Sequence, residues 1–122
     1  MRTRFMAVSI AVLVIGGAGW LRAQPKGEHA TIKGEVVDLW CYLEGGDRGA
    51  AKKACATACA KAGNPIGLVD SKGQVYVTAG LKDHEPGRVM LLDRMSEEVT
   101  VTGTVVHNGG VQMIYVERVA PR

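Results

Sequence analysis

The sequence predicts a mainly β protein: one small five-stranded barrel that carries two short helices and follows a hydrophobic N-terminal segment. Three observations lead to this prediction. Five short segments rich in β-branched or alternating residues follow one another between residues 31 and 119. The chain opens with a long uncharged apolar run. Its length of 122 residues suits a single hydrophobic core and excludes large catalytic folds such as the TIM barrel.

The N-terminal segment has the order of an export signal. Arg2 and Arg4 precede an uncharged run over residues 5–21, and a small residue, Ala23, follows it. This order is typical of a secretory signal peptide, and the run is also just long enough for a retained membrane anchor. The predicted regions are a signal peptide or N-terminal membrane anchor over residues 1–23, a flexible lead over 24–30, and a barrel domain over 31–122 with a helical insertion at about 41–64.

Both alternatives place the barrel outside the cytoplasm, because the two N-terminal arginines hold the start of the chain inside. We therefore expect a periplasmic or secreted protein, anchored to the membrane if residues 1–23 are retained. Contact with the membrane is expected only through that segment.

The charge of the chain also belongs to the N-terminal segment. The chain has 15 Lys and Arg against 12 Asp and Glu, a formal net charge of +3. Three of the basic residues, Arg2, Arg4 and Arg22, lie in residues 1–23, which contain no acidic residue. The rest of the chain is therefore formally neutral, and it lacks the basic surface on which nucleic-acid binding depends.

The first half of the predicted barrel contains one strand and one helix. Residues 31–40 are rich in β-branched side chains and contain Gly34, which indicates a strand with a bend. After a break at Gly45-Gly46, the Ala- and Lys-rich residues 48–62 predict a helix that Gly63-Asn64-Pro65 ends. The apolar stripe expected on this helix consists of Ala51, Cys55, Ala58, Cys59 and Ala62.

The second half contains two hairpins separated by a short helix. Residues 66–69 and 74–78 flank a turn that contains Gly73, and a short helix is expected to start near Pro86. Residues 99–107 and 111–119 form the last two predicted strands. The resulting order fits an OB-like barrel, which carries a helix between its third and fourth strands.

Several motifs resemble those of small exported bacterial proteins that have an OB-like barrel and an inserted C-x3-C helix. They are GEVVD over residues 34–38 followed by Cys41-Tyr42-Leu43, the pair Cys55-x3-Cys59, the run GNPIGL over residues 63–68, and VTVTGTVV over residues 99–106. The resemblance implies a fold and an exported location, and it implies no activity.

The three cysteines are the residues most suited to chemistry. Cys55 and Cys59 lie four positions apart, on one face of the predicted helix, and Cys41 lies at the end of the first predicted strand. Three interpretations follow. Cys41 forms a disulfide with Cys55 or Cys59 and leaves one free thiol; or the three thiolates bind a soft metal, copper(I) or zinc; or the leftover thiol exchanges with the disulfide.

A fourth metal ligand is expected from His84, with His107 or Met90 as alternatives. Trp40 and Tyr42 flank Cys41 and are expected to pack under the inserted helix; the alternative is that they shield the thiol.

The sequence contains no phosphate-binding Gly loop, no G-x-S-x-G, no H-E-x-x-H and no C-x-x-C-H motif. We therefore predict an exported, non-enzymatic binding protein whose ligand is a soft metal ion held by the cysteines. The alternatives are a disulfide-stapled module that binds an unknown protein partner and a periplasmic thiol-disulfide redox protein.

Overall fold

Five strands close into a barrel in the computed structural model, which describes residues 26–121. Around the barrel, the hydrogen-bonded strands follow one another in the order β1-β2-β3-β5-β4, and β4 pairs with β1. Strands β3 and β5 are parallel, and all other neighbours are antiparallel. This confirms the predicted mainly β, closed five-stranded barrel. The predicted N-terminal signal or anchor helix lies outside the described residues. The strands are β1 (Glu28–Asp38), β2 (Ile66–Asp70), β3 (Val75–Ala79), β4 (Glu98–Asn108) and β5 (Val111–Val119).

Strand β1 bends so that it pairs with two neighbours in succession. Its first part pairs with β4 and its last part with β2, and Gly34 pairs with both. A Cβ at Gly34 would lie 2.7 Å from the carbonyl oxygen of Val69, so the bend requires glycine. Residues 28–30 pair with residues 103–105 of β4 and are thus part of the barrel rather than of the predicted lead.

The helices cover one end and one side of the barrel. The predicted helix over 48–62 is a 3₁₀ turn followed by α2, and the predicted short helix between the third and fourth strands is α3 with a second 3₁₀ turn. Helix α1 was not predicted. The helices are α1 (Leu39–Gly45), η1 (Ala50–Lys52), α2 (Lys53–Ala62), α3 (Arg88–Leu91) and η2 (Leu92–Arg94).

The predicted first strand was expected to reach Trp40, but β1 ends at Asp38. Asp38 accepts a hydrogen bond from the backbone N–H of Cys41, three residues later, which makes it the N-cap of α1. Helix α1 ends at Gly46, which has a left-handed backbone with φ of 71°. Cys41 therefore lies in the first turn of a helix and not at the end of a strand.

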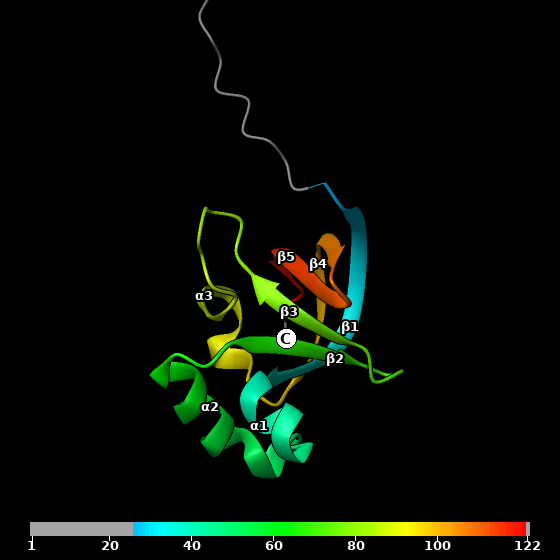
Figure 1. Ribbon diagram of the computed structural model, residues 1–122. Helices are drawn as coiled ribbons and strands as arrows, with labels where there is room; N and C mark the ends of the chain where they lie inside the picture. The colour runs from blue at the N-terminus through cyan, green and yellow to red at the C-terminus, as the bar shows by residue number, and fades with distance from the viewer. Residues whose placement is uncertain (1–25, 122) are drawn as a thin grey trace, which may run out of the picture.

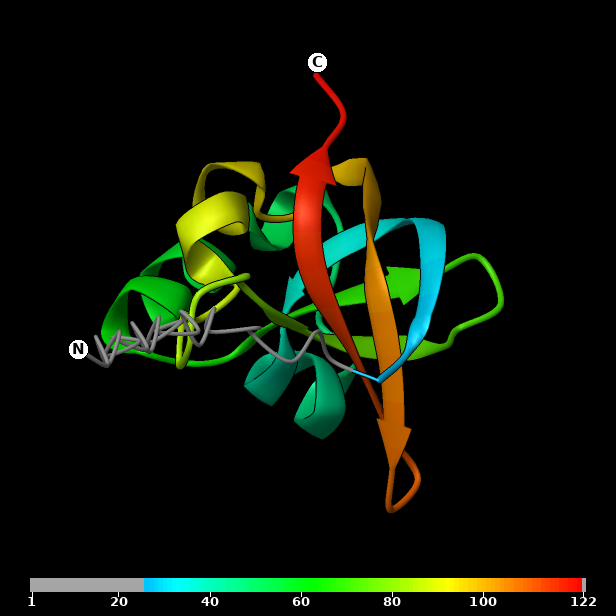
Figure 2. The same ribbon diagram turned by 90° about the horizontal axis from the view of Figure 1, so that it is seen from above.

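Helices α1 and α2 lie at the end of the barrel opposite the start of β1 (Figure 1). Seen from above, α2 and α3 lie on the same side of the barrel, and the turn of the β4–β5 hairpin projects beyond the rest of the barrel (Figure 2). Within residues 26–121, no helix is long and apolar enough to cross a bilayer.

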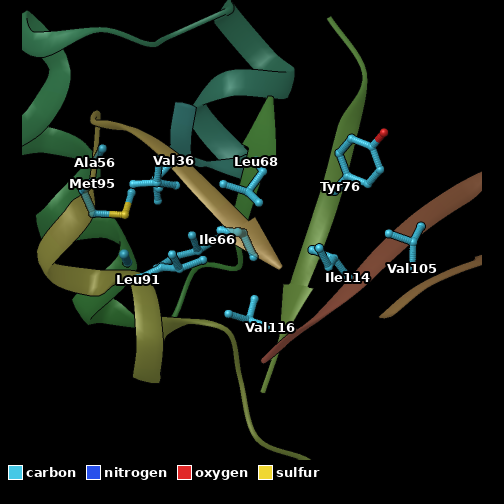
Figure 3. Packing of buried hydrophobic residues seen from close by; sticks show 13 residues of the cluster. Val36, Ala56, Ile66, Leu68, Tyr76, Leu91, Met95, Val105, Ile114 and Val116 are labelled. Carbon is cyan, nitrogen blue, oxygen red and sulfur yellow. The ribbon is translucent and has the colours of Figure 1, made fainter. Parts of the chain in front are cut away.

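One main hydrophobic cluster fills the barrel and extends under α2. Ala56 of α2 packs beside Met95 and Val36 at one end of this cluster, and Tyr76 and Val105 lie toward the other (Figure 3). Helix α2 buries Ala56 and Ala60. The expected apolar stripe was therefore wrong: the buried positions each come one residue after the expected Cys55 and Cys59. Small alanine side chains allow the helix to approach the barrel closely, and the two cysteines lie on the neighbouring flank of the helix.

Candidate metal centre

Helix α1 places Cys41 by two anchors. Asp38 caps its N-terminus through the hydrogen bond from Cys41 N to Asp38 Oδ1, 2.8 Å long. Leu39, 4% exposed, packs with Val37 and Val69 in a second small cluster. The backbone N–H of Leu39 also donates to the carbonyl of Pro65 at 3.0 Å, which joins the start of α1 to the start of β2. The position of the Cys41 sulfur is therefore set by contacts to the barrel itself.

Helix α2 places the other two cysteines. Its buried face holds Ala60, which is fully buried, and Cys59 precedes it by one position. Gly63, in the left-handed region with φ of 116°, ends the helix, and the N–H of Asn64 donates to the carbonyl of Cys59 at 3.1 Å. The packing of the alanines against the barrel thus turns the cysteine flank toward α1.

Two ion pairs hold the start of the inserted segment against the barrel. Glu35 of β1 accepts hydrogen bonds from Arg48 Nε, at 3.0 Å, and from the backbone N–H of Gly49. Lys53, the first residue of α2, pairs with Glu97 at 2.8 Å. The first contact joins the insertion to β1, and the second joins it to the residue just before β4. The end of α2 that carries Cys55 is therefore held against the barrel, as is the end that carries Cys59.

These elements bring the sulfurs of Cys41, Cys55 and Cys59 to within 4.8 Å of one another. All three are free thiols. A tetrahedral zinc with Zn–S bonds of about 2.3 Å needs sulfurs about 3.8 Å apart, a spacing that these side chains reach by small rotations. The group is half-buried at Cys41 and Cys59 and exposed at Cys55, so it is open to solvent on one side. The three predicted cysteines can therefore hold one metal ion.

The surroundings keep the Cys41 thiol protonated. A hydrogen bond to the Asp38 carboxylate, burial and a hydrogen bond with Cys59 raise the pKa of Cys41 to about 12. Burial is the main cause that raises the pKa of Cys59, and its neighbour Cys55 adds to the effect. A reactive redox cysteine has the opposite property, a lowered pKa. A metal ion must displace these protons when it binds, so the affinity of the site for metal is expected to rise with pH.

One cation lies beside the cluster. Lys52 forms an ion pair with Asp47, with Nζ 2.9 Å from Oδ1. Asp47 is the main cause that raises the pKa of Lys52, and Cys55 and Cys41 contribute to it. This ammonium group is therefore close enough to offset part of the negative charge that bound thiolates would carry.

The expected fourth ligand, His84, is not brought to the sulfurs. It lies in the loop after β3, with its side chain 93% exposed and its Nδ1 3.6 Å from Asp83. His107 is exposed near the end of β4, and Met90 lies in α3. Neither histidine belongs to the group of ligand atoms within 4.8 Å.

The sequence pattern suggests Asp38 only as an acceptor of hydrogen bonds from the inserted segment, and it does not predict that Asp38 caps a helix. Its side chain is 1% exposed, and within residues 26–121 its Oδ2 atom has no hydrogen-bond partner. The sequence does contain a pattern that could have indicated this cap. Asp38 ends a predicted strand and lies three positions before Cys41, and an N-cap side chain accepts a hydrogen bond from the backbone N–H two or three residues later.

Comparison with known proteins yields no relative: no protein-family description, no curated protein and no solved structure matches this chain.

Proposed function

We propose that this protein is an exported, non-enzymatic protein that binds a soft metal ion, zinc or copper(I), through Cys41, Cys55 and Cys59. The observation that carries the proposal is the approach of all three sulfurs to within 4.8 Å of one another, from two separate helices. These are the only cysteines in the chain. Thiolates are soft ligands that favour these two metals over magnesium or calcium.

The geometry supports binding rather than thiol chemistry. The pKa of Cys41, raised to about 12 by its hydrogen bond to Asp38, by burial and by Cys59, makes this thiol a weak nucleophile at neutral pH. A disulfide needs an S–S distance of about 2.0 Å, while three thiolates on one zinc lie about 3.8 Å apart, so metal binding requires the smaller movement of sulfurs that lie within 4.8 Å of one another.

The assignment to an OB-like barrel and the exported location are part of the same proposal. The strand order β1-β2-β3-β5-β4, with α3 between β3 and β4, supports the OB-like assignment. The basic, then apolar, N-terminal sequence supports export. Fractionation of cells and N-terminal sequencing test the location: a mature chain that begins at Gln24 indicates cleavage, and a protein found in the cytosol contradicts export.

Metal binding is tested on the full-length chain, reduced and kept free of oxygen. We expect close to one zinc or copper(I) per chain, protection of the thiols from labelling when metal is bound, and at least about tenfold weaker binding in Cys41→Ser, Cys55→Ser and Cys59→Ser. His84→Ala and His107→Ala serve as matched controls for the alternative ligands. A reduced chain that binds neither metal contradicts the proposal.

A second candidate function is a disulfide-stapled module that binds a protein partner. The observation that favours it is the exposure of two large apolar side chains on α1, Trp40 at 60% and Leu43 at 70%. Intact mass with thiol labelling of protein taken from its own compartment separates the two functions. One disulfide, one free thiol and no metal favour the module; three metal-protected thiols favour the metal site.

A further inference from the structure

The three sulfurs leave one position of a tetrahedral site unfilled, and one of the three, Cys41, lies in the capped first turn of α1. Structural zinc sites are four-coordinate, and their protein ligands occur in pairs that are close in sequence. Cys55 and Cys59 form one such pair on α2. Cys41 has no second cysteine near it in the sequence, so its partner must be a residue of another type.

Asp38 has the position of that partner. It stands three residues before Cys41, and the cap hydrogen bond from Cys41 N to Asp38 Oδ1, 2.8 Å long, folds its carboxylate back over the first turn of the helix. Asp38-x2-Cys41 and Cys55-x3-Cys59 then have the paired spacing of zinc ligands.

The second oxygen of this carboxylate is available. Asp38 is 1% exposed, and within the described part of the chain no donor reaches its Oδ2 with hydrogen-bond geometry. A buried carboxylate oxygen without a partner is costly, and such groups in native proteins are commonly explained by a bound ion or water. Oδ1 already serves as the helix cap, so Oδ2 can bind a cation while the cap stays in place.

The solvent exposure of Asp38 and the three cysteines increases from Asp38 to Cys55. Asp38 is buried, Cys41 and Cys59 are half-buried, and Cys55 is exposed. Of these four residues, Asp38 is thus the one most shielded from water, and Cys55 is the one that an ion from solvent reaches first. In this conformation Asp38 lies outside the group of atoms within 4.8 Å, so the carboxylate or the sulfurs must close on the ion when it binds.

We propose that Asp38 Oδ2 is the fourth ligand of this site, which thereby selects a divalent d¹⁰ cation such as Zn²⁺ over Cu(I). This inference rests on the proposed metal-binding function. Carboxylate oxygen is a common zinc ligand, with Zn–O of about 2.0 to 2.2 Å, while Cu(I) is satisfied by the three soft sulfurs. Loss of the carboxylate therefore weakens binding of zinc far more than binding of copper(I).

The test uses the full-length reduced chain and the variant Asp38→Asn, because asparagine caps a helix as well as aspartate does. Competition with chromophoric chelators is expected to show zinc affinity at least about tenfold lower in Asp38→Asn, with copper(I) affinity changed less than about threefold. The matched control Asp83→Asn removes the same charge from an exposed loop and is expected to change neither affinity. Equal zinc affinity in Asp38→Asn and Asp83→Asn overturns the inference.

Two further measurements keep the inference testable if Asp38→Asn does not fold. Asp38→Cys is expected to bind Co²⁺ with sulfur-to-metal charge-transfer intensity of four thiolates instead of three, and unchanged intensity contradicts a ligand position at 38. X-ray absorption of the wild-type zinc complex is expected to show three sulfurs and one oxygen; sulfur ligands alone, or an imidazole, contradict it. A wild-type chain that binds neither metal refutes the proposed function itself, whereas metal binding that is indifferent to Asp38 refutes only its role as a ligand.

Discussion

The side chain of Leu39 occupies the space beside Gly67 where any other residue would carry its Cβ. A Cβ built on Gly67 would collide with Cγ and Cδ2 of Leu39. Leu39 is the first residue of α1, and Gly67 is the second residue of β2. The glycine thus allows the start of the helix that carries Cys41 to rest directly on the barrel, and the position of the metal site depends on this contact.

Gly67→Ala is therefore expected to destabilise the protein by about 1 to 3 kcal/mol, because Leu39 must leave its place in the second cluster. Urea unfolding of the metal-free protein measures the loss. Gly45→Ala is the matched control, since its Cβ would meet only Asp47 Oδ1 at 3.8 Å and its φ is not positive. A Gly67→Ala variant as stable as Gly45→Ala would contradict the close packing of Leu39.

Ala60→Leu tests whether the packing of α2 positions the cysteines. Ala60 is fully buried against the barrel, so a larger side chain is expected to push the helix outward, with a loss of about 1 to 3 kcal/mol in unfolding free energy and weaker metal binding. Ala58→Leu places the same side chain on an exposed position of the same helix and should change neither. Full metal affinity in a folded Ala60→Leu variant would argue against this dependence.

The contact of Glu35 with Arg48 and Gly49 is expected to hold the loop before α2. Glu35→Gln removes the charge from a side chain that is 13% exposed and should cost about 1 kcal/mol. It should also speed hydrogen exchange in residues 46–50, which mass spectrometry detects. The control is Glu98→Gln, which breaks an ion pair between two exposed side chains, Glu98 at 65% and Lys33 at 69%. This change should lower the free energy of unfolding by less than about 0.5 kcal/mol.

Thiol reactivity in the metal-free protein is expected to follow the surroundings of each cysteine. The pKa of Cys41 is raised to about 12, first by the hydrogen bond to Asp38, so its thiolate fraction at pH 8 is small and grows about tenfold per pH unit. Iodoacetamide should therefore modify exposed Cys55 faster than Cys41, as peptide mapping by mass spectrometry measures. Asp38→Asn lowers the pKa of Cys41 and should speed its modification; an unchanged rate would contradict the contact.

The same shift has a consequence for stability. The folded protein keeps the Cys41 proton to higher pH than the unfolded chain does. The contribution of this thiol to the free energy of unfolding is therefore complete below pH 9, and it is lost as the pH rises toward about 12. Between these values, the metal-free wild type should lose more stability than Cys41→Ser, as chemical unfolding at each pH measures. Parallel pH curves for the two proteins would contradict this linkage.

Much of the barrel could be predicted because its signals are local. The alternation of Val99, Val101 and Val105 with threonines sets one buried and one outer face on β4. The residues Gly63-Asn64-Pro65, which directly follow α2, end that helix without help from the rest of the fold. The predicted helix over 48–62 was confirmed for the same reason. The buried stripe on that helix was wrong, because alanine and cysteine are similar in size and polarity, and the choice of face is made by the surface that the helix meets.

Helix α1 escaped prediction because its sequence, LWCYLEG, carries the aromatic residues typical of strands. Trp40 was expected to pack under the inserted helix, yet it is 60% exposed. The start of a helix at Leu39 reverses the alternation of a strand, so Leu39 turns inward and Trp40 outward. The decisive interaction is the Asp38 cap, together with the anchoring of Leu39 on Gly67.

The sequence alone determined the closed five-stranded barrel, the order of its elements and the identity of the three cysteines, because periodicity and turn residues act over a few positions. The exported location stays a prediction from the N-terminal residues. Only the tertiary structure decided that the three sulfurs meet, that His84 does not join them, and that Asp38 is buried as the cap of the helix that carries Cys41. Cys41 and Cys59 are far apart in the chain, and their approach depends on how two helices pack against one barrel end.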